Sequence, residues 1–272
     1  MAKIIGVALR VNPGSCPLLS MARSDYILVP MPWDFFLLLV VLGAVVPWRA
    51  AVRVRRLLEQ PQSATADRLA LYASTIAFQW AAAAIVLWRC AARHLGGAQL
   101  ALAMPHSRRA IFAAVVLVAV FTANQLLALR RLAQLPQDRR GFLGDMARRI
   151  FPRNAIEGLA FFALVATVAL CEEFLYRGFV QGVFDSFPRG FPLLGAIVSA
   201  VFFSVAHVYQ GKRGLVVTFL VGLLFAMVRF WTGSLAPGVI AHFAADLVAG
   251  LGGGRLLSSG TSAEGTGDNQ GH

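Results

Sequence analysis

Long apolar stretches alternate with short polar segments along most of the chain. A bilayer core of about 30 Å requires about 20 apolar residues in helical form, at a rise of about 1.5 Å per residue. The pattern therefore predicts an all-α fold, a polytopic transmembrane helical bundle of about seven spans, with six to eight as the range. The predicted spans are residues 33–48, 69–88, 110–129, 155–184, 191–209, 215–231 and 234–251.

The composition favours a membrane protein over a soluble one. Of the 272 residues, 58% are hydrophobic and 14% are charged, whereas soluble domains carry about 25% charged residues. Such a chain is too apolar for one water-soluble core and also for a disordered polymer. Its three cysteines, Cys16, Cys90 and Cys171, are too few and too scattered for a disulfide framework or a CxxC zinc site.

The positive charge lies mainly between the apolar stretches. The formal net charge is +12, and cations in such gaps are typical of cytoplasmic loops in membrane proteins. Aromatic residues do not alternate with the basic clusters, so we expect membrane lipid and no nucleic acid as a partner. We expect an integral, multi-pass protein of the plasma or inner membrane, with its N-terminus outside the cell.

Three regions follow from these patterns. Residues 1–154 form an N-terminal transmembrane and basic-loop region, in which 141–153 resembles an amphipathic helix at the membrane interface. Residues 155–251 form a membrane core that carries the unusual polar residues described below. Residues 252–272 form a small, polar tail that we expect to be disordered. Residues 1–30 do not fit a signal peptide, because Arg10 and Pro13 interrupt the apolar stretch.

Ionisable side chains at membrane depth are costly, and they point to function. In the segment ALCEEFLYRGF, Glu173 and Arg177 are spaced i, i+4 with the acid first, the better orientation for an ion pair within a helix. Glu172 is one position round the helix, so the same arginine does not neutralise it. An unpaired carboxylate of this kind can take up a proton. The alternative is that both glutamates extend to the membrane interface.

Two further segments carry histidine. Phe203 and His207 are spaced i, i+4, which lets the phenyl ring shield the imidazole from lipid. His242 and Asp246 have the same spacing, so Asp246 can accept a hydrogen bond from the ring and fix its tautomer. Each segment alone also fits a structural role, a satisfied interface histidine or a His–Asp pair within one helix. Three such segments in succession predict one shared interior cavity.

If every helix is straight, these residues lie at different depths in the membrane. Glu172 and His242 lie near the middle of their predicted spans, whereas His207 lies near the end of its own. Straight helices would place His207 about 10 Å from the other two. A tilt, a kink near Glu172 or a longer fifth helix would each remove the mismatch.

The three motifs EExxxR (Glu172, Glu173, Arg177), FxxxH (Phe203, His207) and HxxxD (His242, Asp246), in this order, resemble those of the CPBP family. This family contains the type II CAAX prenyl endopeptidases and the Abi-like membrane proteases. The resemblance covers roughly residues 155–251.

The resemblance implies an intramembrane endopeptidase that hydrolyses a peptide bond at or within the membrane. It implies Glu172 as the general base, with His207 helping to hold the attacking water, and His242 with Asp246 stabilising the oxyanion. Glu173, Arg177 and Phe203 would be structural or orienting residues. The implied substrate is a membrane-associated peptide or protein, such as a C-terminal CAAX-like or other membrane-anchored tail.

One position departs from the common family pattern. Many members have Asn where this chain has Asp246, and an ionised carboxylate cannot donate to an oxyanion. Either Asp246 is protonated, or it acts by orienting His242. We favour the second interpretation, because the i, i+4 spacing already provides that contact.

Two alternative functions stay open. The first is a zinc-dependent protease that uses Glu172, His207 and His242 as ligands, although HExxH is absent and no cofactor is required by the spacing. The second is a non-catalytic membrane binding or immunity protein, or a proton-coupled carrier, because intramembrane Glu, His and Asp also build proton relays.

Overall fold

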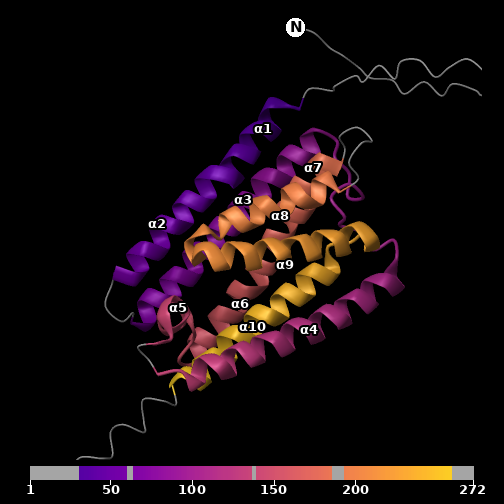
Figure 1. Cartoon of the computed structure of the whole chain (residues 1–272). Helices are drawn as coiled ribbons and strands as arrows, with labels where there is room; N and C mark the ends of the chain where they lie inside the picture. The colour runs from indigo at the N-terminus through magenta and orange to yellow at the C-terminus, as the bar shows by residue number, and fades with distance from the viewer. Residues whose placement is uncertain (1–30, 60–63, 137–138, 186–192, 259–272) are drawn as a thin grey trace, which may run out of the picture. The chain divides into compact units, whose positions relative to one another are not determined.

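The computed structural model describes residues 31–59, 64–136, 139–185 and 193–258 (Figure 1). Within these ranges the regular secondary structure is helical, which confirms the predicted all-α bundle. In the described part of the chain, six helices are long and apolar enough to cross a membrane, and a further apolar helix is shorter. The expectations for residues 1–30 and for most of the polar tail fall outside the described residues.

The first long helix extends well beyond its apolar stretch. It consists of α1 (Trp33–Val40), the π-helical segment η1 (Val41–Val45) and α2 (Val46–Glu59). The sequence predicts an end near residue 48, but the helix continues through an arginine-rich segment. Arginine is a good helix former, and its long side chain reaches water from a membrane interface. Polar residues can therefore continue a spanning helix, which a search for apolar runs misses.

The remaining elements follow the predicted order. α3 begins where the Asp67 carboxylate accepts a 3.0 Å hydrogen bond from the Ala64 backbone N–H. α9 ends at Gly233, whose φ of 67° is in the left-handed region and whose N–H donates to the Arg229 carbonyl over 2.8 Å. These elements are α3 (Thr65–Ala92), α4 (Ser107–Gln134), α5 (Gly141–Ile150), α6 (Ala155–Glu172), η3 (Glu173–Val180), α7 (Gln181–Asp185), α8 (Leu194–Ala206), η4 (Val208–Gln210), α9 (Gly211–Thr232) and α10 (Ala236–Ser258).

Two differences from the sequence prediction concern the polar segments. The predicted span 191–209 corresponds to the shorter helix α8, which ends at Ala206 and leaves His207 as its C-terminal cap. The long span 155–184 is not uniform, because η3 is a π-helix that begins at Glu173. A π-helical segment within an α-helix is rare and is frequently found at functional sites.

Helix pairs pack with small residues inside and large apolar residues outside. α4 lies along α10, α8 along α9, and α3 along α6 (Figure 1). On α4, the alanines 110, 113 and 114 are buried, whereas Ile111, Phe112 and Val115 are 61%, 63% and 64% exposed. Large apolar side chains on the outer surface are what lipid contact requires, and small residues let helix backbones approach closely.

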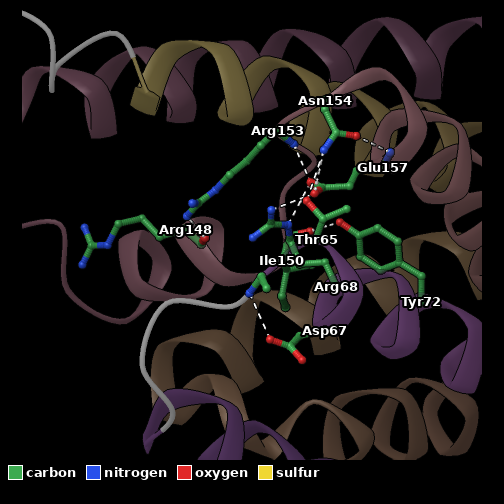
Figure 2. A network of polar contacts seen from close by, with 10 residues as sticks. Thr65, Asp67, Arg68, Tyr72, Arg148, Ile150, Arg153, Asn154 and Glu157 are labelled. Atoms are coloured by element: carbon green, nitrogen blue, oxygen red, sulfur yellow. Dashed lines mark hydrogen bonds and ion pairs between the residues drawn. The ribbon is translucent and has the colours of Figure 1, made fainter.

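A buried polar network joins the start of α6 to α3 (Figure 2). The Arg68 guanidinium donates two hydrogen bonds to the fully buried Glu157 carboxylate, over 2.8 and 2.7 Å. The Arg153 backbone N–H and the Asn154 amide also donate to this carboxylate, over 2.8 and 2.9 Å. The Tyr72 hydroxyl donates to the carbonyl of Ile150, at the end of α5. The network therefore fixes α3, α5 and α6 relative to one another.

Candidate functional site

A cavity of about 470 Å³ lies among these helices. Most of its wall is apolar, with side chains such as Leu42, Val46, Phe78 and Val168. A few polar and ionisable side chains interrupt this wall, and pockets with such convergent polar groups are the usual places for binding and catalysis. They are Arg49, Arg53, Thr75, Gln79, Glu172, Tyr176, His207, Tyr209, Gln210, His242 and Asp246.

Glu172 is the last residue of α6, directly before the π-helix. Its Oε1 accepts a 3.0 Å hydrogen bond from the side-chain amide of Gln79 on α3. Its Oε2 is buried and has no hydrogen-bond partner in the described part of the chain. A buried oxygen without a partner is costly in a folded protein, and such an atom is a candidate for a ligand, a water or a proton.

Glu173 points to a different set of partners. Its Oε1 accepts from the Arg177 guanidinium over 3.0 Å, which is the predicted i, i+4 ion pair. The same oxygen lies 3.3 Å from Nδ1 of His242 on α10. Gly238 makes this approach feasible, because a Cβ at that position would lie 2.8 Å from Glu173 Oε2. Glu173 thus links the π-helix to α10.

The side chain of Arg177 is completely buried. Its guanidinium carbon lies 4.0 Å from the centre of the Phe203 ring and 5.6 Å from that of Phe225. Cations are attracted to the faces of aromatic rings, particularly where water is absent. Phe203 therefore contacts the cation of the first motif as well as the histidine of its own helix.

His207 is held by its own helix. Its Nδ1 lies 2.8 Å from the carbonyl oxygen of Phe203, and the two ring centres are 4.6 Å apart. A carbonyl only accepts, so Nδ1 carries the proton in this contact, by assignment from geometry. In the neutral ring Nε2 then presents a lone pair. Because His207 lines the cavity, this nitrogen can accept a hydrogen bond from a water there.

His242 lies between two carboxylates. Nδ1 faces Glu173 at 3.3 Å, and Nε2 faces Asp246 Oδ2 at 3.5 Å. The Asp246 contact is the one that the i, i+4 spacing predicts, whereas the Glu173 contact joins two helices and was not predicted. A ring with a proton on both nitrogens satisfies both acceptors.

The structure brings Glu172, His207, His242 and Asp246 to the wall of one cavity. The depth mismatch expected for His207 does not prevent this, because His207 lines the same cavity as Glu172 and His242. The proposed orienting residues Glu173, Arg177 and Phe203 are not part of the cavity wall. Glu173 contacts His242 and Phe203 contacts His207, both of which line the cavity, whereas Arg177 contacts Glu173 and Phe203. Their catalytic and orienting roles remain predictions.

Sequence reasoning missed Gln79. It is a single amide within the apolar stretch 69–88, and it is not titratable, so a search for ionisable groups passes over it. Its polarity within a membrane span was the available signal. With respect to metals, no three His, Cys, Asp or Glu side chains in the described ranges are placed to hold an ion together.

Comparisons with known proteins agree with the motifs. Residues 154–248 match the family model described as type II CAAX prenyl endopeptidase Rce1-like. An uncharacterized 24.3 kDa protein of Escherichia coli is 32% identical over 135 residues, which is 48% of this chain and 57% of that protein. No solved structure matches the chain significantly. Residues 154–248 are thus an Rce1-like segment, and the resemblance to the CPBP family is confirmed there.

Proposed function

We propose that this protein is an intramembrane endopeptidase in which Glu172 activates a water molecule. The observation that carries the proposal is the buried, unpartnered Oε2 of Glu172 on a cavity that His207 and His242 also line. The match of the surrounding segment to an endopeptidase family supports peptide hydrolysis as the reaction.

The first step needs a water between Glu172 and His207. One hydrogen of the water points to Glu172 Oε2 and the other to Nε2 of His207, so the oxygen lone pair is directed at the substrate carbonyl. As the oxygen attacks the carbonyl carbon, Glu172 takes the first proton as general base. The carbonyl π electrons move to its oxygen, and a tetrahedral oxyanion forms.

His242 is the donor for this oxyanion. Its Nε2 lies 3.5 Å from Asp246 Oδ2, which is longer than a normal hydrogen bond, so the Nε2–H can donate to an oxyanion placed closer to it. Glu173 holds the other side of the ring. A preorganised donor of this kind commonly contributes about 10²–10³ in rate. Asp246 in this scheme orients the ring and does not donate.

Collapse of the intermediate completes the hydrolysis. The C–N bond breaks, the carbonyl re-forms, and Glu172 returns its proton to the leaving nitrogen. The products are a carboxylic acid and an amine, and Glu172 is again a carboxylate. Atoms and charge balance without any further reagent.

The apolar wall favours a substrate segment that is itself apolar. We propose a membrane-anchored peptide or protein tail, C-terminal CAAX-like or another kind, reached from the plasma or inner membrane. Water can enter because polar groups line one part of a cavity that is otherwise apolar.

The test is a comparison of peptide termini in cells that express wild type, Glu172→Gln or Glu59→Gln at equal levels. Glu59 is exposed at the end of α2 and serves as the matched control. We expect at least one membrane-protein terminus that is trimmed in wild type and Glu59→Gln but intact in Glu172→Gln. Identical termini in all three strains would overturn the proposal.

A further inference from the structure

Two arginines in the cavity wall differ from the arginines buried in the bundle. The buried ones are Arg68, Arg177 and Arg229, and each forms an ion pair with an acid of the chain. Arg49 and Arg53 line the cavity, and neither has a carboxylate partner among the described residues. The cavity wall therefore contains two cations that form no ion pair within the described residues.

The contacts of these two arginines are with uncharged groups. Arg53 donates to the Leu71 carbonyl over 3.3 Å and to the Ser74 hydroxyl, both on α3. The Arg49 guanidinium lies 4.0 Å from the centre of the Phe78 ring, also on α3. These contacts orient both side chains along α3. Neutral partners fix the position of a guanidinium without satisfying its charge, so its preference for an anion remains.

Two contacts on helix α3 give the distance between Arg53 and Glu172 along the helix axis. Ser74 binds Arg53, and Gln79 binds Glu172, so the two contacts are about 7.5 Å apart along the helix axis. An extended peptide advances about 3.3 Å per residue. One short peptide segment can therefore reach from Arg53 to Glu172 within the same cavity.

We propose that Arg49 and Arg53 bind the C-terminal carboxylate of the peptide substrate, an inference that rests on the proposed function. A guanidinium matches a carboxylate in geometry, with two parallel N–H···O bonds. The acidic groups Glu172 and Asp246 on the same wall repel a carboxylate placed beside them. The charges thus set the direction of the peptide, with its free end toward α2 and the scissile bond toward Glu172.

The test uses one library of apolar peptides made in two forms, with a free C-terminal acid and with a C-terminal amide. Purified full-length protein in vesicles of zwitterionic lipid cleaves each form, and mass spectrometry measures the ratio of acid to amide cleavage at low substrate concentration. The variants are Arg53→Gln and the double variant Arg49→Gln/Arg53→Gln. Arg55→Gln is the matched control, because Arg55 is exposed on the same helix and lies outside the cavity wall.

We expect wild type and Arg55→Gln to prefer the acid form by about ten-fold or more, since hydrogen bonds between charged groups are stronger than those between neutral ones. The double variant is expected to lower the ratio to near one. A general loss of folding lowers both reactions together and leaves the ratio unchanged, so the ratio reports the site itself.

Three outcomes overturn the inference. Equal cleavage of both forms by wild type leaves the proposed function intact but removes the carboxylate site. A preference for the acid form that survives in the double variant would show that groups other than Arg49 and Arg53 bind the carboxylate. A loss of preference on adding anionic lipid to the vesicles, with wild type itself, assigns the arginines to lipid headgroups. Failure of wild type to cleave either form would instead contradict the proposed function.

Discussion

The side-chain amide of Gln79 donates a 3.0 Å hydrogen bond to Oε1 of Glu172. This bond joins α3, which lies outside the Rce1-like segment, to the first motif of that segment. It occupies one carboxylate oxygen and leaves Oε2 without a partner in the described structure. In the proposed mechanism, this free oxygen is the one that takes the proton from water, and Gln79 holds the other.

Gln79→Leu is expected to reduce kcat about 10- to 100-fold with little change in KM. The lost bond is to a charged group and contributes about 1.5–3 kcal/mol, and about 1.4 kcal/mol corresponds to a factor of ten in rate. Thr75→Val is the control, because this residue lines the same cavity and its hydroxyl donates to the Leu71 carbonyl of its own helix, with no contact to Glu172 among the described residues. Steady-state kinetics of the two variants measure kcat and KM. Equal activity in Gln79→Leu and wild type would show that the amide does not position Glu172.

Glu173→Gln is expected to lower the free energy of unfolding by about 3–5 kcal/mol. The substitution leaves the fully buried Arg177 cation without its carboxylate, the costly way to break a buried pair. Thermal unfolding in detergent measures the loss.

A double variant that removes both charges of this ion pair distinguishes an effect on stability from an effect on activity. Glu173→Gln/Arg177→Met is expected to recover most of the stability, because no uncompensated charge remains. It is not expected to recover activity, because His242 has still lost the carboxylate at Nδ1. A double variant with wild-type kcat would show that Glu173 acts only in the ion pair.

Asp246→Asn and Asp246→Leu test how the acid at this position acts. If Asp246 orients His242, the Asn oxygen still accepts from Nε2–H, so this variant should keep activity within about ten-fold of wild type. Leu cannot accept, and we expect a loss of about 10- to 100-fold, the range for loss of a partner that orients a metal-ligating histidine. Equal activity in the two variants would contradict the orienting role.

Glu157→Gln is expected to destabilise the protein without a direct effect on the chemistry. Glu157 is buried, accepts from Arg68, Arg153 and Asn154, and is not part of the cavity wall (Figure 2). Loss of its charge breaks the buried ion pair with Arg68, at a cost of about 3–5 kcal/mol. The melting temperature in detergent should therefore fall, while the KM of the remaining folded protein should stay unchanged. A large change in KM with a normal melting temperature would contradict a purely structural role for Glu157.

Local features of the fold could be predicted from the sequence because they depend on neighbours within one helix. The apolar runs identified the spans, and the i, i+4 spacings gave the Glu173–Arg177 and His242–Asp246 contacts that the structure contains. The direction of Glu172, away from Arg177, follows from the same geometry.

Contacts between helices could not be predicted in this way. Gln79 and Glu172, or Glu173 and His242, are far apart in the chain, and no spacing rule relates them. The π-helix at Glu173 and the early end of α8 before His207 were also not predicted, because tertiary packing rather than apolar length decides them. The apolar pattern places Arg49 and Arg53 in a basic loop after residue 48, whereas the structure places them on α2, because the helix continues past its apolar part.

The central claim is that Glu172 activates the water that cleaves the substrate. The most direct measurement is the rate of peptide-bond hydrolysis by the purified full-length protein, as wild type, Glu172→Gln and Glu59→Gln, at equal folded concentration. We expect a loss of about 10²–10⁴-fold in Glu172→Gln, the range for removal of a general base, and an unchanged rate in Glu59→Gln. A rate for Glu172→Gln equal to that of wild type would contradict it.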